Sequence, residues 1–131
     1  MLTREQQYAA NTFERLSELG PQPDEKKKKY GSMAHKLPVL IRVAGLAQAL
    51  HFVDSRGNDD QKLLLRHLAL TLGLTDDYEG ENRLTAQAKL LKSSRESQLS
   101  TYIRLTHKSL AALQWYKRFA QSVLRVESGE E

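Results

Sequence analysis

The stretch YGSMAHKLPVLIRVAGLAQALHFV, residues 30–53, decides the fold. From Pro38 onward, its only side chains that are neither apolar nor small are Arg42, Gln48 and His51. At about 100° per residue, the apolar positions cover nearly the whole helical wheel, and a helix that is apolar all round must be enclosed. It is shorter than the ~20 residues that span a bilayer. The sequence therefore predicts a buried central helix over residues 38–53.

Helical segments are also predicted before this centre. Thr3 and Gln6 form a capping-box pattern, and Gly20 stops a first helix over residues 3–19. Asp24 can cap a second helix, which should break before Pro38 because the residue preceding a proline is biased away from the helical region. We attribute Gly45, inside the central helix, to close packing of a neighbouring helix.

Three helical segments are predicted after the centre, over residues 59–72, 81–92 and 95–126, with a break at Ser93–Ser94. No segment alternates convincingly with the period of two that is typical of a strand. The predicted fold is all-α, a compact helical bundle of about five to seven helices. Residues 1–131 form one domain, with a long basic C-terminal helix and a frayed acidic tail over residues 127–131.

Composition limits the possible classes of protein. The chain has 131 residues and no cysteine, so it can form neither disulfides nor a reactive thiolate. Its N-terminus, MLTREQQY, carries charges at once and has no apolar region of the kind found in signal peptides. These features predict a cytoplasmic protein without a membrane segment.

Charge is segregated along the chain, so the net charge of +4 understates the electrostatics. Residues 54–82 carry three basic and seven acidic side chains, whereas residues 83–126 carry nine basic side chains and one acidic one, Glu96. A basic block of this kind is either a surface for polyanions or a face that meets an acidic partner.

The predicted last helix concentrates this charge on one side. Arg104, Lys108, Arg118 and Arg125 fall within about 100° of each other on the wheel, and Trp115 lies among them. Cations neutralise phosphates and an indole can stack on a base, so this arc is a candidate RNA-binding surface. Two alternatives remain for Trp115: it packs on another helix, or it faces a protein partner.

A second basic feature is the run of four lysines near the start of the predicted second helix. A run of this kind is either a solvated helix start or a nonspecific contact with a polyanion. The candidate RNA-binding residues in it are Lys26, Lys27, Lys28 and Lys29.

The sequence offers little support for catalysis. The four histidines are scattered, without the spacing of a metal site, and no phosphate-binding glycine loop or nucleophile elbow is present. Ser32 and His35 lie three residues apart on a predicted helix, which favours local packing over a catalytic dyad. We therefore predict a protein that is not an enzyme, with no cofactor, no metal and no small-molecule substrate.

A possible helix-turn-helix reading is weak. Residues 68–75, LALTLGLT, look like the first helix and turn of such a motif. Residues 76–81, DDYEGE, would then place acidic side chains where a recognition helix must approach phosphates. The more economical interpretation is that Gly73 ends a helix.

Two stretches resemble a known family. They are YGSMAHKLPVLI at residues 30–41, continuing into AGLAQAL at residues 44–50, and LQWYKRFA at residues 113–120. This combination is similar to the small-subunit family of the type III-B CRISPR effector, the Cmr complex of the RAMP module. The resemblance implies an all-α, non-catalytic subunit that stacks in several copies beside the repeated backbone subunits, along a groove that holds guide RNA and target RNA.

Three cations of this sequence lie at positions that match the motifs of the family: Lys36, Lys117 and Arg118. The resemblance implies that they are candidates for RNA contact. On the wheel, we expect Lys117 to lie on the opposite side from Arg118, so that the two cannot face one RNA strand. One of them would then serve contacts between subunits.

The function predicted from the sequence is a non-catalytic assembly subunit of a CRISPR effector in antiviral defence. Its partners would be other subunits of the complex, further copies of itself, guide RNA and target RNA, which it would contact through a basic face. The alternative is a protein-interaction module in which the acidic segment, residues 54–82, of one copy meets the basic segment, residues 83–126, of the next.

Overall fold

The structure is a computed structural model that describes residues 1–77 and 84–129. Within these ranges the chain is all-helical, which confirms the predicted fold class. In order, the helices are α1 (Arg4–Leu19), α2 (Asp24–Ala44), α3 (Leu46–Arg56), α4 (Asp59–Thr71), α5 (Ala86–Glu96) and α6 (Leu99–Ser122). None of them is long and apolar enough to cross a membrane in the part of the chain that is described.

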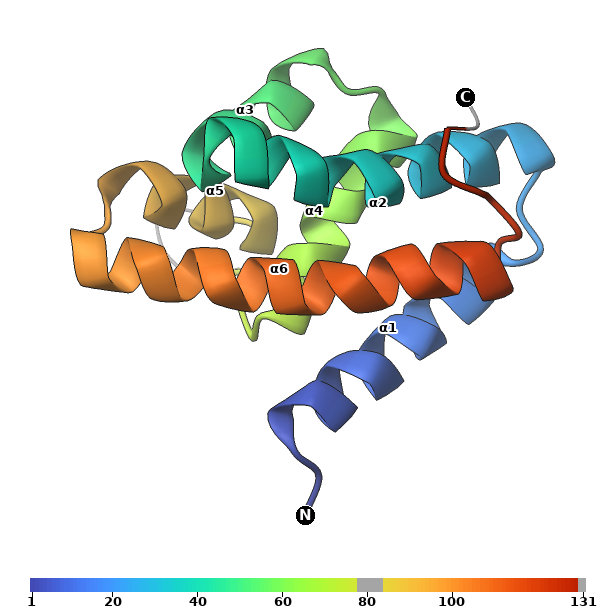
Figure 1. Cartoon of the computed structure of the whole chain (residues 1–131), viewed down its shortest axis with the longest axis horizontal. Helices are drawn as coiled ribbons and strands as arrows, with labels where there is room; N and C mark the ends of the chain where they lie inside the picture. The colour runs from blue at the N-terminus through green and yellow to red at the C-terminus, as the bar shows by residue number, and fades with distance from the viewer. Residues whose placement is uncertain (78–83, 130–131) are drawn as a thin grey trace.

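The two longest helices, α2 and α6, lie side by side and run in opposite directions (Figure 1). Helices α3, α4 and α5 cover the side of this pair on which the core lies, and α1 crosses near the C-terminal half of α6 (Figure 1). After α6 the chain turns back and crosses the N-terminal half of α2, so the last described residues lie far from the N-terminus (Figure 1).

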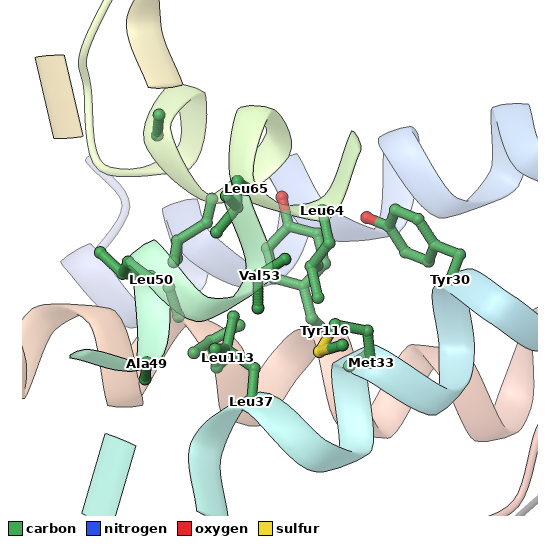
Figure 2. Close-up of a cluster of buried hydrophobic side chains, with 14 of the residues drawn as sticks. Tyr30, Met33, Leu37, Ala49, Leu50, Val53, Leu64, Leu65, Leu113 and Tyr116 are labelled. Carbon is green, nitrogen blue, oxygen red and sulfur yellow. The ribbon is translucent and has the colours of Figure 1, made fainter. Parts of the chain in front are cut away.

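The labelled side chains of the core in Figure 2 come from α2, α3, α4 and α6. Leu37 of α2, Leu50 and Val53 of α3, Leu64 of α4 and Leu113 of α6 are all fully buried. Burying a side chain of this size stabilises a fold by about 1.5 to 3 kcal/mol relative to leaving it exposed. This inward packing fixes which side of each helix faces outward.

The prediction of one central helix over residues 38–53 was wrong. Helix α2 continues through Pro38 as far as Ala44, and the break comes at Gly45, followed by α3. Pro38 is itself buried, as is Leu37 before it, so tertiary packing outweighs the local preference against a helix at this point. Gly45 has φ 89° and ψ 159°, a conformation that is essentially restricted to glycine.

The reason given for Gly45 was also incomplete, because the residue serves mainly as the break between two helices. A Cβ atom at this position would lie 3.3 Å from the hydroxyl oxygen of Tyr102 on α6. That hydroxyl accepts a hydrogen bond of 3.2 Å from the backbone N–H of Ala47. Tyr102 therefore satisfies a backbone donor at the start of α3, where no capping side chain of the neighbouring sequence does so.

The central region is also less enclosed than its composition predicted. Val39, Val43 and Phe52 are exposed. They lie on the side of α2 and α3 that faces away from the core. The segment is therefore apolar on nearly every side, but the rest of the protein covers only part of it.

The predicted long helix over residues 95–126 was wrong at both ends. Arg95 belongs to α5, which begins at Ala86 and includes the predicted break at Ser93–Ser94; residues 81–83 of the predicted 81–92 helix lie outside the described ranges. Ser97 is extended, and its hydroxyl donates to the carbonyl oxygen of Ser93 at 2.6 Å. This local bond competes with helix continuation, so a chain break occurs without glycine or proline.

The other end of that helix stops at Ser122, where the chain leaves the helix and folds back onto α2. Leu124 and Val126 are buried by this reversal, and Val126 accepts a hydrogen bond of 2.8 Å from Nε2 of His35 through its carbonyl oxygen. Residues 127–129 are exposed and lie outside any helix, while residues 130–131 fall outside the described ranges, so fraying of the tail stays a prediction.

Gly31 is the position on α2 that makes this contact possible. A Cβ atom there would lie 2.6 Å from Cβ of Val126, which is closer than real Cβ atoms approach one another. The segment after α6 can therefore lie against α2 only because residue 31 has no side chain.

We expect Gly31→Ala to displace Val126 and to lower the free energy of unfolding by about 1 to 3 kcal/mol through overpacking. The measurement is chemical denaturation together with amide exchange of residues 123–126. In a Val126→Gly background the colliding atoms are gone, and the same substitution should become neutral or stabilising, because alanine is better than glycine in a helix by about 1 kcal/mol. Equal effects in both backgrounds would contradict the assignment.

Candidate nucleic-acid interface

The side of α6 that faces away from the core carries the predicted basic arc. Arg104 and Arg118 are exposed, while Lys108 and Trp115 are half-buried at the edge of the same side. We call these four residues the α6 face. The inner side of α6, which includes Leu113 and other buried residues, packs into the core and therefore holds the α6 face toward solvent.

The cations of the α6 face are not neutralised by the rest of the described chain. Arg104, Lys108 and Arg118 have no carboxylate oxygen within the 4.0 Å of a salt bridge there, whereas ion pairs form elsewhere, as between Lys89 and Asp77 at 2.8 Å. Because no internal partner competes, these cations keep their full electrostatic attraction for a phosphate or an acidic side chain.

Trp115 packs partly against its own helix. Its ring stacks on Phe119 with centroids 5.7 Å apart and an interplanar angle of 28°. Phe119 in turn meets Phe13 of α1 edge-on, with centroids 5.4 Å apart. The indole therefore contributes to the contact between α6 and α1 and is still half-exposed, so contact between Trp115 and RNA stays a prediction.

Lys117 and Arg118 line the same hollow, which corrects the expectation that they lie on opposite sides. The hollow has a volume of about 280 Å³ and is lined by Gln114, Lys117, Arg118 and Gln121. Consecutive residues of a helix differ by about 100°, so side chains this long can converge on one space between them. The two glutamines were missed, although the spacing of residues 114, 118 and 121 predicts one exposed helix side.

Arg125 lies apart from the α6 face, so its predicted place on a helical arc was wrong. It follows the end of α6 with φ 59°, because the chain reverses there to bury Leu124 and Val126. It instead lines a hollow of about 490 Å³ with Lys27 and Lys28 from the start of α2.

The lysine run is only partly available for a partner. Lys27 pairs with Asp24 at 3.3 Å and donates to the carbonyl oxygen of Gly20 at 3.2 Å. Lys29 pairs with Glu25 at 3.3 Å. Lys26 and Lys28 are exposed. The lysine run is therefore mainly the start of α2, with ion pairs to residues of the same helix. Exposed ion pairs of this kind contribute little to stability.

Lys36, the remaining predicted residue, is exposed farther along α2 and lines hollows formed by α2 with other segments. The predicted RNA-binding residues therefore do not form one continuous stripe. They divide among the α6 face with Lys117, the start of α2 with Arg125, and Lys36 on the outer side of α2.

Ser32 and His35, the pair for which local packing was predicted, lie in the interior of the protein. Both residues are buried, and Nε2 of His35 lies 2.8 Å from the carbonyl oxygen of Val126. Because a carbonyl oxygen only accepts, this ring nitrogen must be the donor. Residues 1–77 and 84–129 contain no group of three His, Asp or Glu side chains placed to hold a metal ion.

A cluster of polar side chains lies inside the bundle, where α1, α2, α4 and α6 meet. Nδ1 of His67 lies 2.7 Å from the hydroxyl of Tyr30. The hydroxyl of Tyr116 donates to the backbone carbonyl of His67 at 3.1 Å and lies 2.7 Å from the hydroxyl of Thr71. Arg15 donates to the Thr71 hydroxyl at 3.1 Å. These bonds connect four helices through side chains that are largely inaccessible to a substrate.

Burial is the main cause of the pKa shifts in this cluster. It raises the pKa values of Tyr30 and Tyr116 above the ordinary value for tyrosine. It also lowers the pKa of His67 to about 4, with further lowering by the nearby charges of Arg15 and Arg66. At neutral pH the imidazole is therefore uncharged, and the Tyr30 hydroxyl donates to its Nδ1 atom.

The depressed pKa of His67 makes stability depend on pH in a defined window. The unfolded chain takes up a proton near pH 6.5, whereas the folded chain resists protonation until about pH 4. Stability is therefore fully present above pH 6.5 and is lost as the pH falls toward 4, by roughly 3 kcal/mol from this group. Denaturation curves between pH 7.5 and 5 measure the slope.

A matched pair of variants isolates this effect. His67→Asn keeps an acceptor for the Tyr30 hydroxyl but does not titrate, so its stability should vary less between pH 6.5 and 5 than that of the parent. His107→Gln removes an exposed histidine of α6 and should leave the slope unchanged. An unaltered slope in the His67 variant would refute the assignment.

Comparisons with known proteins agree with one another. The family model described as CRISPR-associated protein (Cas_Cmr5) matches residues 4–123. A relative from Thermus thermophilus, named CRISPR system Cmr subunit Cmr5, is 44% identical over 124 residues, which are 95% of this chain and 98% of the relative. A crystal structure of a Cmr5 family protein from the same organism has a TM-score of 0.79 and 41% identity, covering 94% of this chain and 98% of that one.

Proposed function

Because the chain belongs to the Cmr5 family of CRISPR-associated proteins, we propose that it is a non-catalytic assembly subunit of a Cmr ribonucleoprotein effector. In this proposal several copies stack along the complex beside the other Cmr subunits. Each copy contacts the backbone of guide or target RNA through the α6 face. The complex would act in antiviral defence against invading RNA.

The observation that carries the RNA contact is the pair of exposed, unneutralised arginines on α6. Arg104 and Arg118 have no salt-bridge partner among the described residues and project from a helix whose other side is fixed in the core. Arginine binds phosphate through several N–H donors at once. Contacts of this kind recognise the backbone and not the bases, which suits a complex whose sequence specificity comes from pairing with a guide.

A role without catalysis is supported by what the polar side chains do inside the protein. His35 is bonded to the carbonyl of Val126, and His67 accepts from Tyr30 in its uncharged form. Both imidazoles therefore serve packing between helices. The proposal assigns this chain binding and positioning, and it assigns the chemistry of the effector to other subunits.

Charge reversal tests the RNA contact. In the reconstituted effector, Arg104→Glu combined with Arg118→Glu should weaken capture of target RNA, because two phosphate contacts become repulsions. The dependence of log affinity on log salt should also become shallower by roughly 1 to 2. Filter binding or fluorescence anisotropy over a range of salt concentrations measures both quantities.

The control reverses two exposed lysines on other helices, Lys62→Glu on α4 and Lys92→Glu on α5. It changes the net charge by the same amount but leaves the α6 face intact, so the salt slope should stay near that of the parent. If the arginine and lysine pairs behave alike, the effect is one of total charge, and the α6 face is not an RNA surface.

The second candidate function is a protein-interaction module that does not touch RNA. One observation favours it in part: Asp54 and Asp59 are exposed in the acidic segment and could meet the basic face of a neighbouring copy. A second observation argues against this function. Asp76 pairs with Arg66 at 2.7 Å and Asp77 pairs with Lys89, so these two acidic side chains already have partners within the molecule.

The two functions separate before RNA is added. If the Arg104 and Arg118 reversals prevent assembly of the protein components alone, the α6 face is a protein interface. If assembly proceeds and only RNA capture falls, the face contacts RNA. Size-exclusion chromatography with light scattering, on components prepared without RNA, distinguishes these results.

A further inference from the structure

Three aromatic rings from two helices meet at the surface where α1 crosses α6. Phe13 belongs to α1, and Trp115 and Phe119 belong to α6. Phe13 is 51% exposed, and the two rings of α6 are half-buried. We call these three residues the aromatic cluster. Single exposed apolar side chains need no explanation, but a contiguous group of them at the surface is typical of a binding site.

Phe119 connects the other two rings of the cluster and holds them at an angle to one another. Its ring stacks on that of Trp115 with an interplanar angle of 28°. It meets the ring of Phe13 at 74°. A flat ligand ring placed beside Trp115 and Phe13 can therefore stack on one of them and meet the other edge-on. Both arrangements are favourable for aromatic pairs.

The backbone that carries the cluster is anchored in the core. Each of the three rings has a neighbour in sequence that is completely buried: Thr12, Tyr116 and Ala120. The inner sides of α1 and α6 are therefore fixed before any ligand arrives. A surface that is organised in advance loses less conformational entropy on binding.

The side chains around the cluster are mostly small, and one is positively charged. Residues three and four positions away are the nearest neighbours on the surface of a helix. At these positions around the three rings no residue is acidic. Apart from the rings themselves, the exposed or half-buried members of this set are Ala9, Ala10, Ser17, Ala111, Arg118, Ser122 and Val123. Small neighbours leave the rings accessible, and a negatively charged ligand meets no carboxylate beside them.

Two cations accompany the cluster along α6. Arg118 lies three residues after Trp115, and Lys108 lies seven residues before it, which places Lys108 two helical turns away on the same side. Neither cation has a carboxylate oxygen within 4.0 Å among the described residues. An anion that follows α6 past the rings therefore meets an unneutralised positive charge on each side of Trp115.

This combination favours a nucleotide over a protein segment as the ligand. A nucleobase is flat, stacks on aromatic rings whatever its identity, and is joined to a phosphate. A protein helix docks through aliphatic contacts, whereas Val123 is the only aliphatic side chain larger than alanine among the accessible neighbours named above. The bases inside a duplex are already stacked on both faces, so the ligand must be an unpaired base.

We propose that the aromatic cluster stacks an unpaired base of a single RNA strand, whose phosphates lie on Lys108 and Arg118. The base covers the exposed parts of Phe13 and Trp115. This inference rests on the proposed function and deepens it, because it adds to the backbone contact of the α6 face a base contact that does not depend on the identity of the base. It also brings α1 into the RNA site through Phe13.

Trp115 is the only tryptophan of the chain, so its fluorescence reports directly on the cluster. At low salt, single-stranded oligoadenylate should quench the emission of the full-length protein. An abasic oligomer of the same length has the same phosphates but no bases, and it should leave the emission nearly unchanged. Equal responses to the two oligomers, or no response to either, would overturn the proposal.

Two phenylalanines of similar exposure provide a matched pair of variants. Phe13→Leu removes a ring but keeps an apolar side chain, so the affinity for oligoadenylate should fall about five-fold or more. Phe13→Tyr keeps the ring and should bind as the parent does. Phe52→Leu changes a residue of α3 that is 49% exposed, against 51% for Phe13, and should have no effect.

Fluorescence anisotropy of labelled oligomers measures these affinities, and circular dichroism checks that each variant is folded. An unchanged affinity in the Phe13→Leu variant, or an equal loss in the Phe52→Leu variant, would contradict the role of the cluster.

Photocrosslinking identifies the ligand in the assembled effector. Phe13→p-azidophenylalanine keeps an aromatic ring and should crosslink to RNA at an unpaired nucleotide, whereas the same probe at Phe52 should not crosslink to RNA. Crosslinks from position 13 to another protein subunit alone would assign the cluster to a protein contact and overturn the proposal.

The oligomers also separate this inference from the function on which it rests. Reversal of Arg104 and Arg118 acts on phosphates and should weaken the binding of both oligomers; no weakening of either would overturn the backbone contact. Phe13→Leu acts on the base and should weaken only the binding of oligoadenylate. If the parent protein binds the two oligomers equally well, the base contact is overturned and the backbone contact stands.

Discussion

The antiparallel packing of α2 against α6 is the constraint on which the remaining structure depends. Leu37 and Tyr30 from one helix and Leu113 and Tyr116 from the other are fully or almost fully buried in the shared core (Figure 2). With these inner sides fixed, the outward sides of both helices are determined as well. The outward direction of the basic α6 face, and the exposure of Val39 and Val43 on α2, follow directly from where the core lies.

Polar groups make this packing specific. The side chains of Tyr30, His67, Thr71 and Tyr116 bond to one another or to backbone from three different helices. A buried polar group that loses its partner costs about 1 to 3 kcal/mol, so alternative registers between the helices leave several such groups unsatisfied. The cluster therefore favours one arrangement of α2, α4 and α6 over others with similar apolar burial.

Helix positions were predictable from the sequence wherever a local signal marked them. The capping box at Thr3 and the stop at Gly20 lie directly beside the observed ends of α1, and the helix predicted over residues 59–72 begins where α4 begins. The sequence misled where tertiary contacts decided the outcome. Pro38 lies inside a helix because it is buried there, and the real break, at Gly45, is visible only as a positive φ supported by Tyr102.

The same distinction holds for the candidate site. Periodicity placed Arg104, Lys108 and Arg118 together because α6 is regular between them, and the structure keeps them on one side. Periodicity failed for Arg125, since the burial of Leu124 and Val126 pulls that residue off the helix. Periodicity could not predict that Lys36 of α2 lines one hollow with Phe52 and Arg56 of α3, because two helices must pack together to form that hollow.

The return of the chain across α2 also has a practical side for anyone handling this protein. Val126 is the last buried side chain among the described residues, and Ser128 and Gly129 beyond it line a hollow together with Lys36 and Val39 of α2. A purification tag or fluorescent protein fused to the C-terminus would thus be anchored next to that hollow and would obstruct it. Met1 is fully exposed at the far end of α1 (Figure 1), which makes the N-terminus the safer place for a fusion.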